Sequence, residues 1–225
     1  MGGKRLETLA DMAPRTDTLA DIGTDHGMLL TGLALAGKIR RGIGVEIAQG
    51  PFARAQAHIA GLGLADTIEM RLGDGLSPLS PGEATACAIA GMGGPTIVGI
   101  LEDCPAVAEA LDWMLLQPMT WEGRVRLYLQ EKGWRICGED LVEERGILYQ
   151  IILAERGSMP SLSDAEAVFG PMLIGGRHPL LVELVRQRVQ GLQDIVDGLG
   201  RSQTEESHAK KARLLAQIED WEALL

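Results

Sequence analysis

Cysteine, aromatic residues and positive charge are all scarce in this sequence of 225 residues. Its three cysteines form no C-x-x-C pair, so we expect neither a disulfide framework nor a thiolate zinc site, and the usage is typical of a reducing cytoplasm. No run approaches the roughly 20 apolar residues of a membrane-spanning helix, and the opening segment, MGGKRLETLADMAP, lacks the apolar region of a secretory signal. A hydrophobic content of 46% excludes a disordered chain and predicts one globular domain, alone or with a small appendage.

The net charge of −10 argues against a surface that is positive all over, as in many nucleic-acid-binding proteins. It leaves room for one basic face on an acidic body. Lysine and arginine gather in four places: Lys38, Arg40 and Arg41; Arg124 and Arg126; Arg177, Arg186 and Arg188; Lys210, Lys211 and Arg213. Solvated surface charge is the simpler interpretation of any one cluster, whereas clusters on a shared face would bind RNA in a salt-dependent way.

Short apolar runs alternate with helical patterns from the start of the chain to about residue 155. Five runs are typical of strands: 18–22, 42–46, 67–72, 86–90 and 114–117, the last stopped by Pro118. Strand, turn and helix in repeated order predict βαβ units and a parallel sheet with helices on both faces, an α/β fold.

The next two runs break this order. Residues 135–143 and 147–155 are separated by three residues, Glu144, Arg145 and Gly146, which predicts an antiparallel hairpin. Because a dinucleotide-binding sheet keeps its six strands parallel, closure by a hairpin favours the Rossmann-like methyltransferase form of the doubly wound sheet.

Two helical stripes make up the rest of the chain. Apolar residues recur at helical spacing over 181–199, and Gly198 and Gly200 predict that this helix ends there. A second stripe covers 212–225. The pair is predicted to be antiparallel and coiled-coil-like, and it is either a packing appendage or a lever that holds a large substrate against the main domain.

The strongest local signal is the segment DIGTDHG at 21–27, which follows a predicted strand and opens a helix. A glycine turn in this context lets the backbone approach a nucleotide. Asp25 stands where a dinucleotide motif has its second glycine, and a carboxylate there would repel a pyrophosphate. S-adenosylmethionine, which has no phosphate and carries a positive sulfonium, fits such a turn. The simpler alternative is a tight turn in which Asp25 caps the helix.

Two further acids follow the next two strands. Glu46 ends the second strand, where an acid is placed to accept hydrogen bonds from ribose hydroxyls. Asp74 follows the third strand, where it either accepts from an adenine amino group or forms an ordinary Asp-Gly turn. Open α/β sheets bind ligands at the carboxyl ends of their strands, so Asp25, Glu46 and Asp74 together predict one pocket.

The fourth and fifth strands end in residues suited to a substrate. The segment Gly91-Met92-Gly93-Gly94 lets a ring approach closely, although Met92 can equally be plain packing. Gln117 offers an amide that can hold a target base, or else is solvated. His26 is placed to orient a base or a carboxylate, or has no catalytic role. The other histidines, His58, His178 and His208, are dispersed and predict no metal site.

The segments DIGTDHGMLL, GVEIAQGPFARA, RLGDGL, IAGMGGPTIVGIL and LLQP, in this order, resemble the bacterial tRNA (adenine(22)-N1)-methyltransferase family over almost the whole chain. The resemblance implies an S-adenosylmethionine-binding domain, residues 1–160, followed by a helical domain, residues 161–225. It implies methyl transfer to N1 of an adenine in the core of tRNA, so that the base must be turned out or the tRNA core locally opened. The implied cofactor contacts are Gly23, Asp25, His26, Glu46, Asp74, Gly75, Ala90, Gly91 and Met92.

Two residues are the catalytic candidates. Methylation makes the adenine ring cationic and its amino group acidic, so a nearby carboxylate can take the proton, and Asp25 is the candidate. Gln117 is the candidate for holding the base. Met119 departs from the pattern, because we expect asparagine after the Gln-Pro pair in that family. A methyltransferase for a small molecule or protein, and a catalytically silent cofactor-binding module, remain the alternatives.

Overall fold

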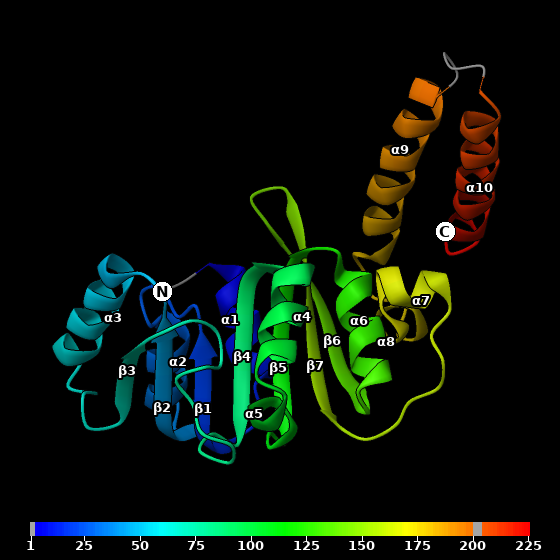
Figure 1. The fold of residues 1–225 in the computed structure, drawn as a ribbon. Helices are drawn as coiled ribbons and strands as arrows, with labels where there is room; N and C mark the ends of the chain where they lie inside the picture. Colours follow the sequence, from blue (N-terminus) through cyan, green and yellow to red (C-terminus); the bar gives the residue numbers. More distant parts are fainter. Residues whose placement is uncertain (1–2, 200–203) are drawn as a thin grey trace.

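A computed structural model describes residues 3–199 and 204–225, and a seven-stranded sheet forms the centre of the larger part (Figure 1). The strand order is β3-β2-β1-β4-β5-β7-β6. Strands β1 to β5 pair in parallel, whereas β7 is antiparallel to both of its neighbours. The strands span Thr16–Ile22 (β1), Ile39–Glu46 (β2), Ile68–Leu72 (β3), Ala86–Gly93 (β4), Trp113–Thr120 (β5), Trp134–Glu144 (β6) and Ile147–Arg156 (β7).

Helices cover both faces of this sheet, which confirms the predicted α/β architecture (Figure 1). One face packs against α1 (Lys4–Met12), α2 (Met28–Leu35) and α3 (Gln49–Gly61). The other packs against α4 (Gly94–Asp103), α5 (Pro105–Glu109) and α6 (Glu122–Glu131). Neighbouring residues of a strand point to opposite faces, so Leu19 belongs to the first core and Ala20 to the second.

The hairpin is also confirmed, and its turn is tighter than predicted. Glu144 pairs with Ile147, and the turn residues Arg145 and Gly146 have φ of 55° and 80°. Positive φ at both positions matches the twist of the flanking strands. Glu144 therefore ends β6 at the carboxyl edge of the parallel strands.

Strand β5 runs past Pro118, so the prediction that this proline stops the strand was wrong. Pro118 pairs with Met92 where the register of β4 shifts, and β7 pairs with β5 from Trp113 to Leu116. Because Pro118 lies beyond the paired stretch with β7, its missing N–H removes no ladder bond on that side. The strand therefore carries its end out to Thr120.

Helix α1 was not predicted from the sequence. Its Leu9 is fully buried on the sheet, and Leu6 and Ala10 pack beside it. The Lys38 ammonium donates to the carbonyl oxygens of Ala10, Asp11 and Ala13 at 2.8–3.0 Å, which satisfies the open end of this helix. Lys38 therefore has a structural role, because its ammonium group is occupied by these three hydrogen bonds.

The C-terminal part contains α7 (Asp164–Phe169), α8 (Pro171–Gly175), α9 (Leu181–Leu199) and α10 (Glu205–Glu222). Helices α9 and α10 lie side by side and project beyond the carboxyl edge of the sheet (Figure 1). The predicted stop at Gly200 lies outside the described residues. Helix α10 begins well before the predicted residue 212, where the Thr204 side chain accepts from the Ser207 amide. None of the described helices is long and apolar enough to cross a membrane.

Arg126 shows that one predicted basic cluster is not a surface feature. Its side chain is fully buried, pairs with Glu139 at 2.6 Å and donates to Gln150 Oε1 at 2.7 Å. It also donates to the carbonyl oxygens of Ala167 and Val168 in α7. Arg126 therefore ties the C-terminal part to the sheet and is not available to RNA.

Candidate active site

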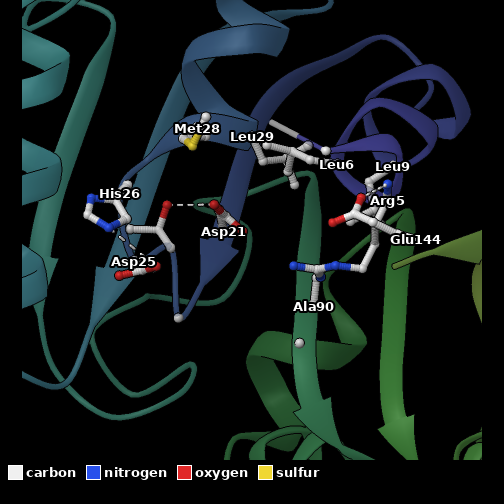
Figure 2. Close-up of a pocket in the computed structure, with 14 residues that line it drawn as sticks. Arg5, Leu6, Leu9, Asp21, Asp25, His26, Met28, Leu29, Ala90 and Glu144 are labelled. Carbon is white, nitrogen blue, oxygen red and sulfur yellow. Dashed lines mark hydrogen bonds and ion pairs between the residues drawn. The ribbon is translucent and has the colours of Figure 1, made fainter. Parts of the chain in front are cut away.

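A cavity of about 380 Å³ lies at the carboxyl edge of β1 and β4, a volume typical of small-molecule sites. Helix α1, the turn after β1, the end of β4 and the tip of the β6–β7 hairpin enclose it (Figure 2). Five predicted cofactor contacts line this cavity: Gly23, Asp25, His26, Ala90 and Gly91. The cavity therefore lies at the carboxyl edge of the sheet, where the sequence predicts a bound ligand.

Two glycines keep the backbone of this cavity open. Gly23 has φ of 71°, and a Cβ there would lie 2.3 Å from Met92 Cε. Gly91 has φ of 76°, and a Cβ there would lie 3.7 Å from an Arg5 guanidinium nitrogen. Both conformations favour glycine. Met92 fills the space beside Gly23 and does not line the cavity.

Asp21 is the buried acid of the site. It lies near the end of β1, is 5% exposed, and accepts a 2.5 Å hydrogen bond from the Thr24 hydroxyl. The pKa of Asp21 is raised to about 6, chiefly by burial and also by the nearby charge of Glu46, while the hydrogen bond from Thr24 lowers it. A cation bound in the cavity would stabilise the charged form of this carboxylate. Asp21 belongs to the DIGTDHG segment but was not predicted to be a site residue.

Asp25 and Glu46 lie next to each other at the carboxyl edge, although Glu46 does not line the cavity. The Asp25 amide donates to Glu46 Oε2 at 3.2 Å, and Glu46 Oε1 accepts from the amides of Ile47 and Ala48. Asp25 does not cap α2, because Gly27 is the N-cap and makes no side-chain bond. The Asp25 carboxylate, 64% exposed, lies 3.8 Å from His26 and 3.9 Å from Arg54.

The third predicted acid lies apart from this group. Asp74 is exposed in the turn after β3, and neither it nor Gly75 lines the cavity. The strands connect them indirectly, because the Gly73 amide donates to the carbonyl oxygen of Glu46 at 3.0 Å. Asp25, Glu46 and Asp74 thus follow one another along the carboxyl edge from β1 to β3. Of the three, only Asp25 lines the cavity.

Gln117 is fully buried, so the alternative that it is solvated was wrong. Its Oε1 accepts from the Arg5 guanidinium at 2.7 Å and from the Gly91 amide at 3.1 Å. Its Nε2 donates to the Pro118 carbonyl oxygen and contacts Met119 Sδ at 3.6 Å. The amide therefore joins α1, β4 and β5 beside the cavity.

Arg5 and Glu144 are site residues that the sequence analysis missed. Arg5 extends from α1 into the cavity, its backbone amide donates to Glu144 Oε2 at 2.9 Å, and its guanidinium lies 5.5 Å from the Tyr149 ring (Figure 2). Its partner Gln117 is 112 positions away in the sequence, so no local motif could connect them. Arg5 brings a permanent positive charge to a cavity that is also lined by Asp21, Asp25 and Glu144.

Comparisons with known proteins agree with this geometry. A family model described as a methyltransferase domain matches residues 3–152. The tRNA (adenine(22)-N(1))-methyltransferase of Bacillus subtilis is 32% identical over 218 residues, 95% of this chain and 92% of that protein. The chain belongs to this methyltransferase family. The resemblance seen in the sequence is therefore confirmed.

Solved structures of similar proteins share the whole fold. The crystal structure of the B. subtilis m1A22 tRNA methyltransferase has a TM-score of 0.91 at 31% identity, and covers 100% of this chain and 98% of that one. A Streptococcus pneumoniae protein solved in complex with S-adenosyl-L-methionine has a TM-score of 0.90 at 30% identity, with both chains covered completely. The C-terminal helices are thus part of the shared architecture.

Proposed function

We propose that this chain transfers a methyl group from S-adenosylmethionine to N1 of an adenine in tRNA, the adenine at position 22. The observation that carries the proposal is the hollow beside Asp21, Gly23 and Gly91, at the strand edge of a chain that belongs to this family. The tRNA substrate follows from the family, and the cofactor follows from both the family and the site.

The residues of the cavity fit this cofactor. S-adenosylmethionine supplies an electrophilic methyl group on a positively charged sulfur. The acids Asp21 and Asp25 would disfavour a phosphate and favour a cationic ligand, and the two open glycines allow close approach. We assign its amino-acid end to the wall formed by Gly23, Ala90 and Gly91.

The nucleoside end belongs further along the edge. We assign the ribose to Glu46 and the adenine to Asp74 and Gly75, as the resemblance implies, with His26 beside them. Glu46 already accepts three backbone hydrogen bonds, and a carboxylate has about four lone-pair sites, so room for a hydroxyl is limited. Met92 supports Gly23 by packing.

Arg5 is our addition to the cofactor contacts. A methionine moiety carries a carboxylate, and the guanidinium of Arg5 lies beside Gly91 in a cavity otherwise rich in acids. A guanidinium matches the geometry of a carboxylate with paired hydrogen bonds. Arg5 would thus bind the ligand and at the same time hold the Gln117 amide.

The target base belongs next to Gly91, where β4 and β5 end. Adenine N1 has a free lone pair, so alignment supplies much of the rate. Gln117 fixes the end of β5 through its bonds to Arg5 and Gly91, and Asp25 remains the predicted acceptor of the proton from the methylated base. We further propose that residues 161–225 form a separate helical domain that holds the tRNA, and that the protein acts in the cytoplasm.

Nucleoside analysis tests this function. The protein is incubated with isotopically labelled S-adenosylmethionine and an unmodified tRNA transcript, and the digested nucleosides are analysed by mass spectrometry. We expect labelled 1-methyladenosine, and none from a matched transcript with guanosine at position 22. Label in another nucleoside, or cofactor binding without any turnover on tRNA, would contradict the proposal and favour the alternative substrates or the silent binding module.

A further inference from the structure

Trp121, the residue directly after β5, combines two unfavourable features. Its side chain is 71% exposed, whereas Trp113, Trp134 and Trp221 are at most 8% exposed. Its backbone is left-handed, with φ of 58° and ψ of 41°. This conformation is rare for a bulky residue, and such strain is concentrated at functional sites. An exposed aromatic ring on a strained backbone is a candidate contact for a ligand.

Trp121 borders a groove of about 440 Å³ between the start of α6 and helix α9. The apolar wall includes Leu192 and Ile195 of α9, and Ile195 is 47% exposed. Two guanidinium groups, from Arg124 and Arg188, also line it. The groove therefore offers a flat aromatic surface, an apolar wall and positive charge within the space of one nucleotide.

The two arginines of this groove differ in their partners. Arg188 is paired with Glu122 at 2.6 Å, which joins α9 to the start of α6. Arg124 is exposed and has no ion-pair partner in the part of the chain that the structure describes. Arg124 is thus the guanidinium that is available to a phosphate.

The groove and the active-site cavity both lie at the carboxyl edge of the parallel strands, because Trp121 directly follows β5, and Ala90 and Gly91 lie near the end of β4. Gln117 and Trp121 are four positions apart on one extended segment, which spans roughly 13 Å. The end of this segment packs closely against Gly94, the first residue of α4, because a Cβ there would lie 2.5 Å from the Trp121 carbonyl oxygen. A base at Gly91 and a neighbouring nucleotide at Trp121 can therefore belong to one RNA strand.

We propose that this groove binds an unpaired nucleotide of the tRNA near the target adenine, with its base stacked on Trp121 and its phosphate beside Arg124. Sequence-tolerant recognition of unpaired RNA works through bases stacked on aromatic side chains. Extruding a base from the tRNA core would free its neighbours to be bound in this way. The inference rests on the proposed function and extends it to a second contact on the substrate.

Three variants of the full-length protein test the stacking. Trp121→Gly removes the ring and suits the left-handed backbone, so we expect it to fold, whereas Trp121→Phe keeps a ring. Leu35→Ala is the control, because it removes a 66% exposed apolar side chain at the opposite edge of the sheet. We expect Trp121→Gly to weaken binding of labelled tRNA by roughly 5- to 150-fold and to raise its KM, with Trp121→Phe much closer to the wild type. Calorimetry should give the same Kd for S-adenosylhomocysteine in all four proteins.

Tryptophan fluorescence provides a direct readout. Because the other three tryptophans are buried, acrylamide should quench mainly Trp121 in the wild type. We expect saturating tRNA to protect this residue from quenching, and Trp121→Phe to abolish the quenchable signal.

Three outcomes would overturn the inference. The first is a Trp121→Gly variant that binds tRNA as the wild type does. The second is quenching that tRNA leaves unchanged. The third is a wild-type dimer that Trp121→Gly dissociates, which would place a second copy of the chain in the groove. Failure of the proposed function would look different, because the wild type itself would then leave tRNA unmethylated.

Discussion

Arg5 provides the sharpest test of how the cofactor is held. Replacing Arg5 by glutamine removes the positive charge that we assign to the methionine carboxylate. The variant should keep its fold, because the Gln117 amide still accepts from Gly91 at 3.1 Å and Glu144 still accepts from the backbone amide of residue 5. The expected effect is therefore on binding and is specific to ligands that carry a carboxylate.

The magnitude follows from the environment of Arg5. A hydrogen bond to a charged group contributes about 1.5–3 kcal/mol, which corresponds to a change of roughly 10- to 150-fold in Kd. Arg5 is half-buried, so solvent and salt screen it, and the lower half of this range is the expectation.

Two ligands that differ in the amino-acid end make the assay specific. S-adenosylhomocysteine has the carboxylate, whereas 5′-methylthioadenosine has the same nucleoside without it. By calorimetry, Arg5→Gln should weaken the first ligand and leave the Kd of the second within about twofold. Lys4→Gln is the matched control, since it removes the same charge from the exposed neighbouring position. Equal losses for both ligands, or none for either, would refute the assignment.

Three further predictions concern stability and RNA binding. Burial raises the pKa of Asp21 from 3.8 to about 6, so its stabilising contribution is fully present only below about pH 4 and is lost as the pH rises through 6. In urea unfolding, Asp21→Asn should therefore gain roughly 2 kcal/mol relative to the wild type between pH 4 and pH 7. Arg126→Met strands the buried Glu139 carboxylate and should lower the free energy of unfolding by about 3–5 kcal/mol, measured by urea denaturation. Arg124→Gln should reduce the slope of log K against log salt for tRNA binding by about 1, while Trp121→Gly leaves this slope unchanged.

Each of these has a contrasting result. A pH-independent difference between Asp21→Asn and the wild type would show that folding does not raise the pKa of this carboxyl group. Arg135→Gln removes an exposed partner of Glu155 and should cost less than about 1 kcal/mol, so a loss as large as that of Arg126→Met would contradict the argument from burial. An unchanged salt slope for Arg124→Gln would show that Arg124 does not contact a phosphate of the tRNA.

Much of the fold could be predicted because it depends on local patterns. The strand runs, the glycine turn at Gly23 and the hairpin at Gly146 each follow from neighbouring residues. Helix α1 is the exception, since its apolar positions, including the buried Leu9, are few and stand beside charged residues. The prediction for Pro118 was wrong because a strand tolerates proline where it no longer pairs with a neighbouring strand. The point at which β7 stops pairing with β5 depends on the tertiary structure and cannot be seen in the local sequence.

The site divides in the same way. Gly23, Asp25 and Gly91 could be placed at the cavity from the sequence, because parallel strands bring their carboxyl ends to one edge. Arg5 and Glu144 could not be placed, because they reach the cavity from elements far apart in the sequence. Arg126 was assigned to a basic surface because charge alone carries no information on burial.

By itself, the sequence determined the order of the strands, the glycine turn and the family, since each of these is encoded in residues close together along the chain. The tertiary structure alone decided which charges are buried, which are exposed and which meet. The free energy of a charged side chain depends on its solvation and its partners, and both are set by segments that fold together from distant parts of the chain.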